Sequence, residues 1–278
     1  MVSTHFKILI VTIISVACIS EIHGQNPSTA QPNVRVLDHS FEIPGLERSR
    51  QIRIYIPPGY NESDQSYPVL YMHDGQNLYD DTTSFVGEWG IDESLNELSS
   101  TSDLNLIVVG IDNGQEKRIH EMSPWDHEKY GKAEGKEYVD FIVHVIKPYI
   151  DSTYRTLSHR ENTGIMGSSL GGFVSHFAIY AYPEVFGKAG ILSSAYWFAD
   201  EIYAFTRENP VPKDTRLCMV VGNHEGEMVE GSRVMYDLIL ETGHPKNNIS
   251  FTIDPEGGHN ETSWKRQFVD AVVWLFGE

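Results

Sequence analysis

The sequence predicts an α/β domain in which about eight strands form a mostly parallel sheet, with helices on both faces and a small or absent cap. Short apolar runs alternate along the chain with longer amphipathic runs, which is typical of repeated βαβ units. The length of 278 residues and the hydrophobic content of 40% suffice for one large domain with a substantial core. Residues 25–278 contain no internal repeat or linker and are expected to form that single domain.

The first 24 residues differ in composition from the rest of the chain. A lysine precedes an apolar run over residues 8–19, which is too short to span a bilayer comfortably and predicts a secretory signal peptide cleaved after Gly24. A lipid anchor at Cys18 is the alternative, although the leucine usual three positions earlier is missing. Without the leader, Cys218 is the one remaining cysteine, so the fold must depend on its core rather than on an internal disulfide.

The charge balance limits the possible partners. The chain has 39 acidic and 21 basic residues, a net charge of -18, which disfavours nucleic acid and anionic membrane surfaces. We therefore expect no nucleic-acid partner and no stable membrane insertion, and the oligomeric state stays open. An N-glycosylation sequon at Asn260 directly follows His259, which a glycan would crowd. This favours export in a bacterium, to the periplasm or the medium.

The early part of the chain is expected to supply antiparallel edge strands. The segments VRVLDHSFEI and RQIRIYIP follow each other without room for a helix between them. Next come YPVLYMHDG, a strand that ends in a turn, and IDESLNELSS, a helix for which Asp92 is the expected N-cap. The run LNLIVVGID is apolar nearly throughout and predicts a fully buried strand.

The rest of the chain is expected to alternate strands and helices. The expected strands are NTGIMG, KAGILSS, RLCMVVG and ISFTIDP, and helices are expected from about Tyr138, Ser169, Met228 and Glu261. Residues 113–135 are polar and are expected to be a loop over one end of the sheet, and residues 195–213 a small cap of mixed helix and loop. The central strands of such an arrangement are parallel.

The stretch GIMGSSLGGF, residues 164–173, crowds small residues between an expected strand and an expected helix. Within it, GSSLG matches G-x-S-x-G, the turn on which a hydrolase holds its nucleophile so sharply that only glycines fit beside it. Ser169 is therefore the predicted nucleophile. The backbone N–H of Leu170, at the start of the following helix, is the predicted donor to an oxyanion forming on a substrate carbonyl.

A serine hydroxyl needs a base, and the base needs an acid that orients it. On an α/β-hydrolase sheet these residues follow in the order serine, acid, histidine. His259, in EGGHNETSW, lies between the last expected strand and the last expected helix and is the predicted base. The other candidates fit worse because they lie within helical patterns or in the long loop: His144, His176, His120 and His127.

The acid is expected after the strand RLCMVVG, where the chain reads NHEGEM. Glu225 suits a tight turn there, whereas Glu227 is expected to be a solvated surface residue and Asp254 a turn residue before a proline. The same segment lacks the second histidine of the H-E-x-x-H zinc motif, so no metal or other cofactor is expected. Cys218 lies in an apolar run and is expected to be a buried, inert thiol.

A second oxyanion donor is expected in the turn HDGQN, residues 73–77, which follows the third strand. Gly75 permits a close backbone approach, so the N–H of Gly75 or Gln76 is the predicted donor. Asp74 is expected to anchor this loop, because a carboxylate that faced the oxyanion would oppose it.

With these residues in place, the sequence resembles the esterase D-like branch of the α/β-hydrolases, which includes siderophore (enterobactin-type), feruloyl and acetyl-xylan esterases. The resemblance runs from about residue 50 to the C-terminus and is carried by VLYMHDGQNLYDD, GEWGIDESLNEL, VVGIDNG, SPW, KPYIDSTYRT, GIMGSSLGGF, VGNHEGEM and GGHNETSW. It implies a carboxylic ester hydrolase with Ser169 as nucleophile, Glu225 as acid and His259 as base, acting through an acyl-enzyme intermediate. The substrate is expected to be an aryl, sugar-linked or siderophore-type ester, either small or attached to a polysaccharide.

Four further residues are candidates for substrate binding: Asn77, Trp89, Trp125 and Trp197. The tryptophans offer flat apolar faces to an aryl or sugar group, although each of them could equally pack in the core or in a loop. Two other classes of protein remain open. An acyltransferase would keep the same triad and exclude water, and a nonhydrolytic binding protein would normally lose one triad member.

Overall fold

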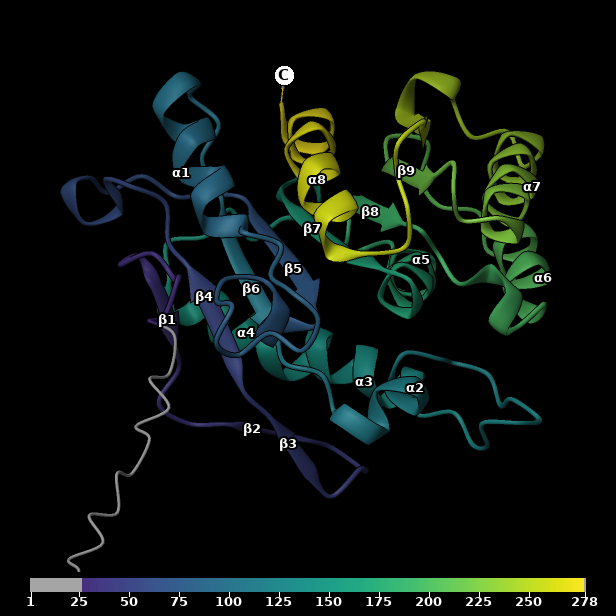
Figure 1. Cartoon of the computed structure of the whole chain (residues 1–278), viewed down its shortest axis with the longest axis horizontal. Helices are drawn as coiled ribbons and strands as arrows, with labels where there is room; N and C mark the ends of the chain where they lie inside the picture. The colour runs from purple at the N-terminus through teal and green to yellow at the C-terminus, as the bar shows by residue number, and fades with distance from the viewer. Residues whose placement is uncertain (1–26, 278) are drawn as a thin grey trace, which may run out of the picture.

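The computed structural model describes residues 27–277, so the predicted signal peptide and Cys18 lie outside the described residues. Within residues 27–277, the main sheet has eight strands in the order β1-β4-β6-β5-β7-β8-β9-β10 (Figure 1). Their bounds are β1 (Val34–Val36), β4 (Ile52–Tyr55), β6 (Ile107–Ile111), β5 (Val69–His73), β7 (Thr163–Ser168), β8 (Lys188–Leu192), β9 (Arg216–Gly222) and β10 (Ile249–Asp254). The strands β1 and β4 join antiparallel, and all strands from β6 to β10 are parallel. The predicted fold class is confirmed.

Helices cover both faces of this sheet, as the buried parallel strands require. The helices of the described residues are α1 (Ile91–Thr101), α2 (Arg118–Glu121), α3 (Gly135–Phe141), α4 (Lys147–Thr153), α5 (Leu170–Ala181), α6 (Glu201–Glu208), α7 (Glu227–Glu241) and α8 (Glu261–Phe276). Alternate side chains of each strand enter two separate apolar clusters. In β5, Val69 and Tyr71 pack with residues of α3, α4, α5 and α7, whereas Leu70 and Met72 pack with residues of α1 and α8.

The first edge segments differ from the prediction. The first expected strand divides into β1 and β2 (Phe41–Ile43), and the second contains β4 but only the last residue of β3 (Arg48–Arg50). The strands β2 and β3 form a separate antiparallel hairpin, while β1 and β4 stay in the main sheet. The hairpin turns at Gly45, whose φ of 82° suits glycine. Phe41 is buried by packing across Tyr149, with ring centroids 4.8 Å apart. The division thus buries the apolar residues of β2 against the helices rather than in the main sheet.

The expected N-cap of α1 is wrong. The capping position is Gly90, with φ 58°, and Asp92 lies inside the first turn. There its side chain is fully buried and its Oδ2 accepts a hydrogen bond of 2.7 Å from the backbone N–H of Gln31. The carboxylate of Asp92 therefore binds the N-terminal segment rather than the end of its own helix.

Two irregular segments lie beside the carboxyl ends of the strands. Residues 113–135 follow β6 and include the short helix α2, which ion pairs between Arg48, Glu121 and Glu134 hold in place. Residues 195–213 include α6, which packs against α7, and form the expected mixture of helix and loop. Among residues 27–277, no helix combines the length and the apolar character needed to cross a membrane.

Candidate active site

Ser169 occupies a strained turn between β7 and α5. Its φ of 58° and ψ of -122° fall outside the usual regions for a residue with a side chain, and such strain is concentrated at functional sites. The turn is anchored on both sides, because the N–H of Ser169 donates to Leu192 O over 3.0 Å and the N–H of Ala195 donates to Ser169 O over 3.1 Å. A Cβ at Gly167 would lie 2.7 Å from the carbonyl carbon of Gly171, so the turn requires glycine there.

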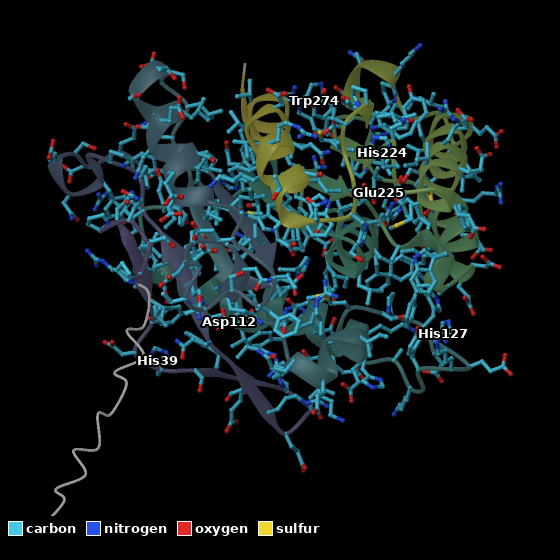
Figure 2. The ribbon with its side chains drawn as sticks, in the orientation of Figure 1. His39, Asp112, His127, His224, Glu225 and Trp274 are labelled. Atoms are coloured by element: carbon cyan, nitrogen blue, oxygen red, sulfur yellow. The ribbon has the colours of Figure 1, made fainter. Side chains whose placement is uncertain are left out.

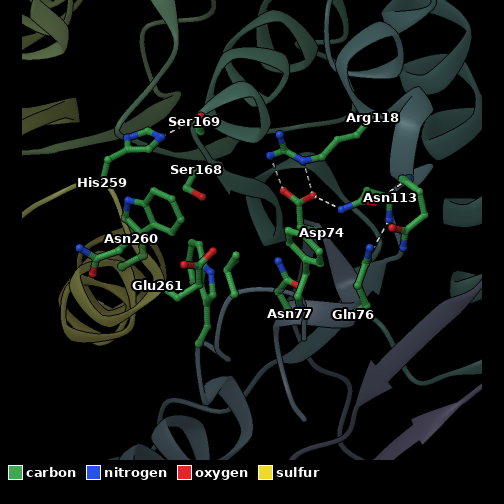
Figure 3. A pocket seen from close by; sticks show the side chains of 15 residues that line it. Asp74, Gln76, Asn77, Asn113, Arg118, Ser168, Ser169, His259, Asn260 and Glu261 are labelled. Carbon is green, nitrogen blue, oxygen red and sulfur yellow. Dashed lines mark hydrogen bonds and ion pairs between the residues drawn. The ribbon is translucent and has the colours of Figure 1, made fainter. Parts of the chain in front are cut away.

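His259 lies on the loop between β10 and α8 and faces this serine. Its Nε2 is 3.0 Å from Ser169 Oγ (Figure 3). The loop is fixed by Asn260, whose side chain caps α8 by accepting from Ser263 N over 3.0 Å. The ring of His259 also packs edge-on against Trp264, with centroids 5.1 Å apart. These contacts hold the imidazole in one orientation toward Ser169.

Glu225 lies in the turn after β9 (Figure 2) and completes a chain of hydrogen bonds with His259 and Ser169. Its Oε2 is 2.8 Å from His259 Nδ1, and its side chain is fully buried. Since a carboxylate can only accept, Nδ1 carries the proton and Nε2 is left to accept from Ser169. The other oxygen of Glu225 accepts from Gly222 N over 2.6 Å and from Ser193 Oγ over 2.7 Å.

The same contacts keep Glu225 ionised. Burial acts to raise the pKa of this carboxyl, but the hydrogen bonds from His259, Ser193 and the N–H of Gly222 outweigh it, so that the pKa lies below its ordinary value. Ser193 is itself held by Trp264, whose Nε1 donates to Ser193 Oγ over 2.9 Å. Sequence reasoning missed Ser193, because its position depends on β8 and β9 being neighbours in the sheet.

The competing residues lie elsewhere. Glu227 opens α7 and is exposed, and Asp254 accepts from Arg266 over 2.5 Å and from Gln267 over 2.9 Å, so neither carboxylate reaches His259. His176 is buried in α5 between Tyr196 and Thr206, and burial lowers its pKa to about 3.

The turn after β5 is rigid and faces Ser169 across the pocket (Figure 3). Asp74 forms an ion pair with Arg118, with Oδ1 2.6 Å from Nε, and accepts from Asn113 Nδ2 over 2.6 Å. Burial opposes the ionised form, but Arg118 and Asn113 outweigh it and hold the pKa of Asp74 below its usual value. Gln76 Oε1 accepts from the N–H of Asn113 over 2.9 Å. Asp74 thus anchors the loop, as expected, and Gln76 adds a second anchor.

Gly75 and His73 show why this turn has the sequence HDGQN. A Cβ at Gly75 would lie 2.7 Å from Asp112 Oδ1 and 2.8 Å from the carbonyl carbon of Gly110, so no other residue fits. His73 is buried against the serine turn, where a hydrogen bond of 2.9 Å joins its Nδ1 to the hydroxyl of Tyr138. Burial lowers the pKa of His73 to about 4, which leaves it neutral.

A pocket of 660 Å³ opens beside Ser169, a volume in the range of small-molecule sites. It is lined by Asp74, Gln76, Asn77, Phe85, Val86, Trp89, Asn113, Gln115, Arg118, Ser168, Ser169, His259, Asn260, Glu261 and Trp264. Of the four predicted substrate residues, Asn77 and Trp89 line it, but Trp125 and Trp197 do not. Trp125 packs against aromatic side chains, among them Phe173 at 5.9 Å, and Trp197 is 56% exposed outside the pocket.

Other chemically reactive groups are few in the part of the chain that is described. No group of three or more His, Cys, Asp or Glu side chains within residues 27–277 is arranged to hold a metal ion. Cys218 is buried in β9, and burial raises the pKa of its thiol to about 12, so it stays protonated as expected of an inert core residue.

A sharp serine turn at the carboxyl end of a mostly parallel sheet, with a histidine after the last strand, is typical of the α/β-hydrolase class. Within that class, the "Putative esterase" family model matches residues 43–275, so the chain belongs to this family and is an esterase. The expected likeness to the esterase D-like branch is confirmed.

The chain is also similar to individual proteins. The uncharacterized protein YbbA of Bacillus subtilis (strain 168) is 25% identical over 244 residues, which cover 83% of this chain and 94% of YbbA. An endo-1,4-beta-xylanase/feruloyl esterase of Xylanibacter ruminicola is 24% identical over 80% of this chain, but over only 29% of that longer protein. The crystal structure of the enterobactin esterase FES from Shigella flexneri has a TM-score of 0.70 at 17% identity, covering 89% of this chain and 60% of FES.

Proposed function

We propose that this esterase is a serine carboxylic ester hydrolase in which Ser169, His259 and Glu225 act as a catalytic triad. The observation that carries the proposal is the unbroken chain of hydrogen bonds, 3.0 Å from Ser169 Oγ to His259 Nε2 and 2.8 Å from His259 Nδ1 to Glu225 Oε2. The first distance allows direct proton transfer from Ser169 to His259, and the second allows Glu225 to orient the imidazole directly.

In the first half of the reaction, Ser169 Oγ attacks the ester carbonyl carbon while its proton passes to His259 Nε2. The oxygen of the tetrahedral intermediate accepts from the N–H of Leu170 and from an N–H of the turn at Gly75 or Gln76. When the bond from carbonyl carbon to alkoxy oxygen breaks, His259 gives its proton to the leaving alcohol and the acyl group stays on Ser169. The ionised Glu225 stabilises the imidazolium that exists between these two transfers.

In the second half, water replaces the alcohol. His259 Nε2 takes a proton from the water, whose oxygen attacks the acyl carbonyl, and returns this proton to Ser169 Oγ as the acid leaves. Acyl transfer would follow the same steps with an acceptor alcohol in place of water. The partition of product between water and an added alcohol distinguishes hydrolysis from transfer, and we expect the free acid to dominate.

The substrates are proposed to be small esters with an aryl, sugar or siderophore-like part, free or attached to a polysaccharide. The feruloyl esterase and enterobactin esterase names of two relatives support this range. Export is likewise proposed from the leader-like composition of residues 1–24, with Cys18 as the alternative lipid-anchor site.

The test is a pair of adjacent substitutions assayed on p-nitrophenyl acetate. Ser169→Ala is expected to abolish turnover while the thermal unfolding midpoint stays close to that of the unsubstituted protein. Ser168→Ala, one residue earlier on β7, is expected to keep most of the turnover. An active Ser169→Ala with an inactive Ser168→Ala would place the nucleophile one residue away from our assignment.

A further inference from the structure

The loop between β5 and α1 carries two exposed apolar side chains at the edge of the pocket. Phe85 is 88% exposed and Val86 is 56% exposed, and both line the pocket that contains Ser169 and His259. Adjacent large apolar side chains exposed at the edge of a pocket are typical of a surface that a ligand covers.

Two largely buried tryptophans line the same pocket, and one of them contacts the histidine. Phe85, Val86, Trp89 and Trp264 line the same pocket and form what we call the apolar wall. The rings of Trp89 and Trp264 lie 5.7 Å apart, and Trp264 in turn contacts His259. The polar groups Asp74, Asn113 and Arg118 lie on the side of the pocket away from His259 (Figure 3).

The loop holds Phe85 and Val86 at the pocket by defined hydrogen bonds. Asn77 closes the loop from inside, because its Oδ1 accepts from Phe85 N over 3.2 Å and its backbone carbonyl accepts from Trp89 N over 2.9 Å. Thr83 Oγ1 donates to Gln76 O over 2.8 Å, which ties the loop to the turn predicted to bind the oxyanion.

A second set of bonds fixes the loop from outside. Asp80 is nearly buried and accepts from Ser28 Oγ over 2.6 Å and from Thr82 N over 2.9 Å. Thr29 Oγ1 accepts from Asp81 N over 2.9 Å. The N-terminal segment is therefore part of the support of the apolar wall, and the exposure of Phe85 is a consequence of a well-anchored loop.

We propose that Phe85 and Val86 are specificity-determining residues that bind an apolar substituent of the ester, on either its acyl or its alcohol side. The proposal rests on the proposed function, since Ser169 places the ester carbonyl at the base of the apolar wall. A hydrocarbon ring held there covers the exposed side chains of Phe85 and Val86.

The test compares matched esters that differ by one phenyl group. Methyl 3-phenylpropanoate against methyl propanoate examines the acyl side, and 2-phenylethyl acetate against ethyl acetate examines the alcohol side. In Phe85→Ala we expect the ratio of kcat/KM for the phenyl ester to that for its small partner to fall about tenfold in one of the two series. Leu157→Ala, an exposed apolar residue outside the pocket, is the control and is expected to leave both ratios unchanged. Unchanged ratios in both series of Phe85→Ala would overturn the proposal.

A binding measurement separates this proposal from the triad. The dissociation constants of methyl 3-phenylpropanoate and 2-phenylethyl acetate are measured by calorimetry in Ser169→Ala, with and without Phe85→Ala. We expect one of them to rise about tenfold in the double variant, whether or not Ser169 is the nucleophile. Equal dissociation constants in both proteins would contradict the subsite. If Ser169→Ala turned over esters as fast as the unsubstituted enzyme, that result would instead contradict the proposed function.

Discussion

Replacing Glu225 by glutamine changes one atom of the proposed triad and leaves its shape intact. In the native protein, Oε1 of Glu225 accepts from two donors, the N–H of Gly222 and the hydroxyl of Ser193. The amide oxygen of glutamine must take this place, because an NH₂ group there would face the Gly222 N–H and leave a buried donor unsatisfied, at a cost of about 1–3 kcal/mol. The NH₂ group is then directed at His259 Nδ1.

That orientation selects the wrong tautomer of the base. An NH₂ donor 2.8 Å from Nδ1 makes Nδ1 an acceptor, so the imidazole proton moves to Nε2 and points at Ser169 Oγ. A protonated Nε2 cannot accept the serine proton. The loss known for such an exchange is roughly 10⁴-fold in kcat, about 5 kcal/mol of transition-state free energy.

The assay is kcat on p-nitrophenyl acetate for Glu225→Gln beside Glu227→Gln and Asp254→Asn, with urea unfolding of each variant. We expect the large loss in Glu225→Gln alone, because Glu227 is exposed and Asp254 binds Arg266 and Gln267 instead of the histidine. Near-normal turnover in Glu225→Gln would refute this reasoning, and a collapse in Asp254→Asn would name a different acid.

Three further predictions follow from the packing and charges. Burial raises the pKa of Asp92 to about 7, above its value in the unfolded chain, so ionisation of Asp92 lowers the stability of the native protein as the pH rises from about 4 through 7. The increase in unfolding free energy caused by Asp92→Asn is therefore expected to be ~2 kcal/mol larger at pH 8 than at pH 5. An equal increase at both pH values would contradict this. Gly167→Ala is expected to lower the unfolding free energy by about 1–3 kcal/mol, whereas Gly231→Ala in α7, where the nearest atom is 3.6 Å from the new Cβ, is tolerated; calorimetric melting compares them. Turnover after dialysis against EDTA is expected to be unchanged, since the triad and backbone donors supply the charge stabilisation, and a loss restored by zinc or calcium would contradict that.

The sequence was most informative where one short segment carries the whole signal. The elbow around Ser169 and the position of His259 depend on local motifs between a strand and a helix, and the structure brings both side chains together. Glu225 could be ranked above Glu227 because the turn after β9 is short. The local geometry of these segments depends mainly on residues within them, so it could be predicted without knowing their distant contacts.

The remaining features depend on residues distant in sequence. Ser193 supports Glu225 across 32 positions, and Gln31 binds Asp92 across 61, so neither contact has a local pattern. The N-cap at Asp92 was wrong because Gly90 adopts the capping position in a left-handed conformation and leaves the carboxylate to bind Gln31. No sequence pattern around Phe85 indicates a binding residue, because its proposed role depends on the shape of a loop that Asn77 holds by a hydrogen bond.

The identity of the nucleophile is tested most directly by covalent trapping. The protein is treated with a p-nitrophenyl phosphonate ester, which reacts with an activated serine and stays attached, and the modified peptide is located by mass spectrometry. We predict one adduct per chain, on Ser169, and a rate of labelling that falls by orders of magnitude in Glu225→Gln, because the wrong tautomer of His259 cannot activate the hydroxyl. An adduct on Ser168 or at another residue, or no adduct under conditions in which the protein hydrolyses esters, would contradict the account.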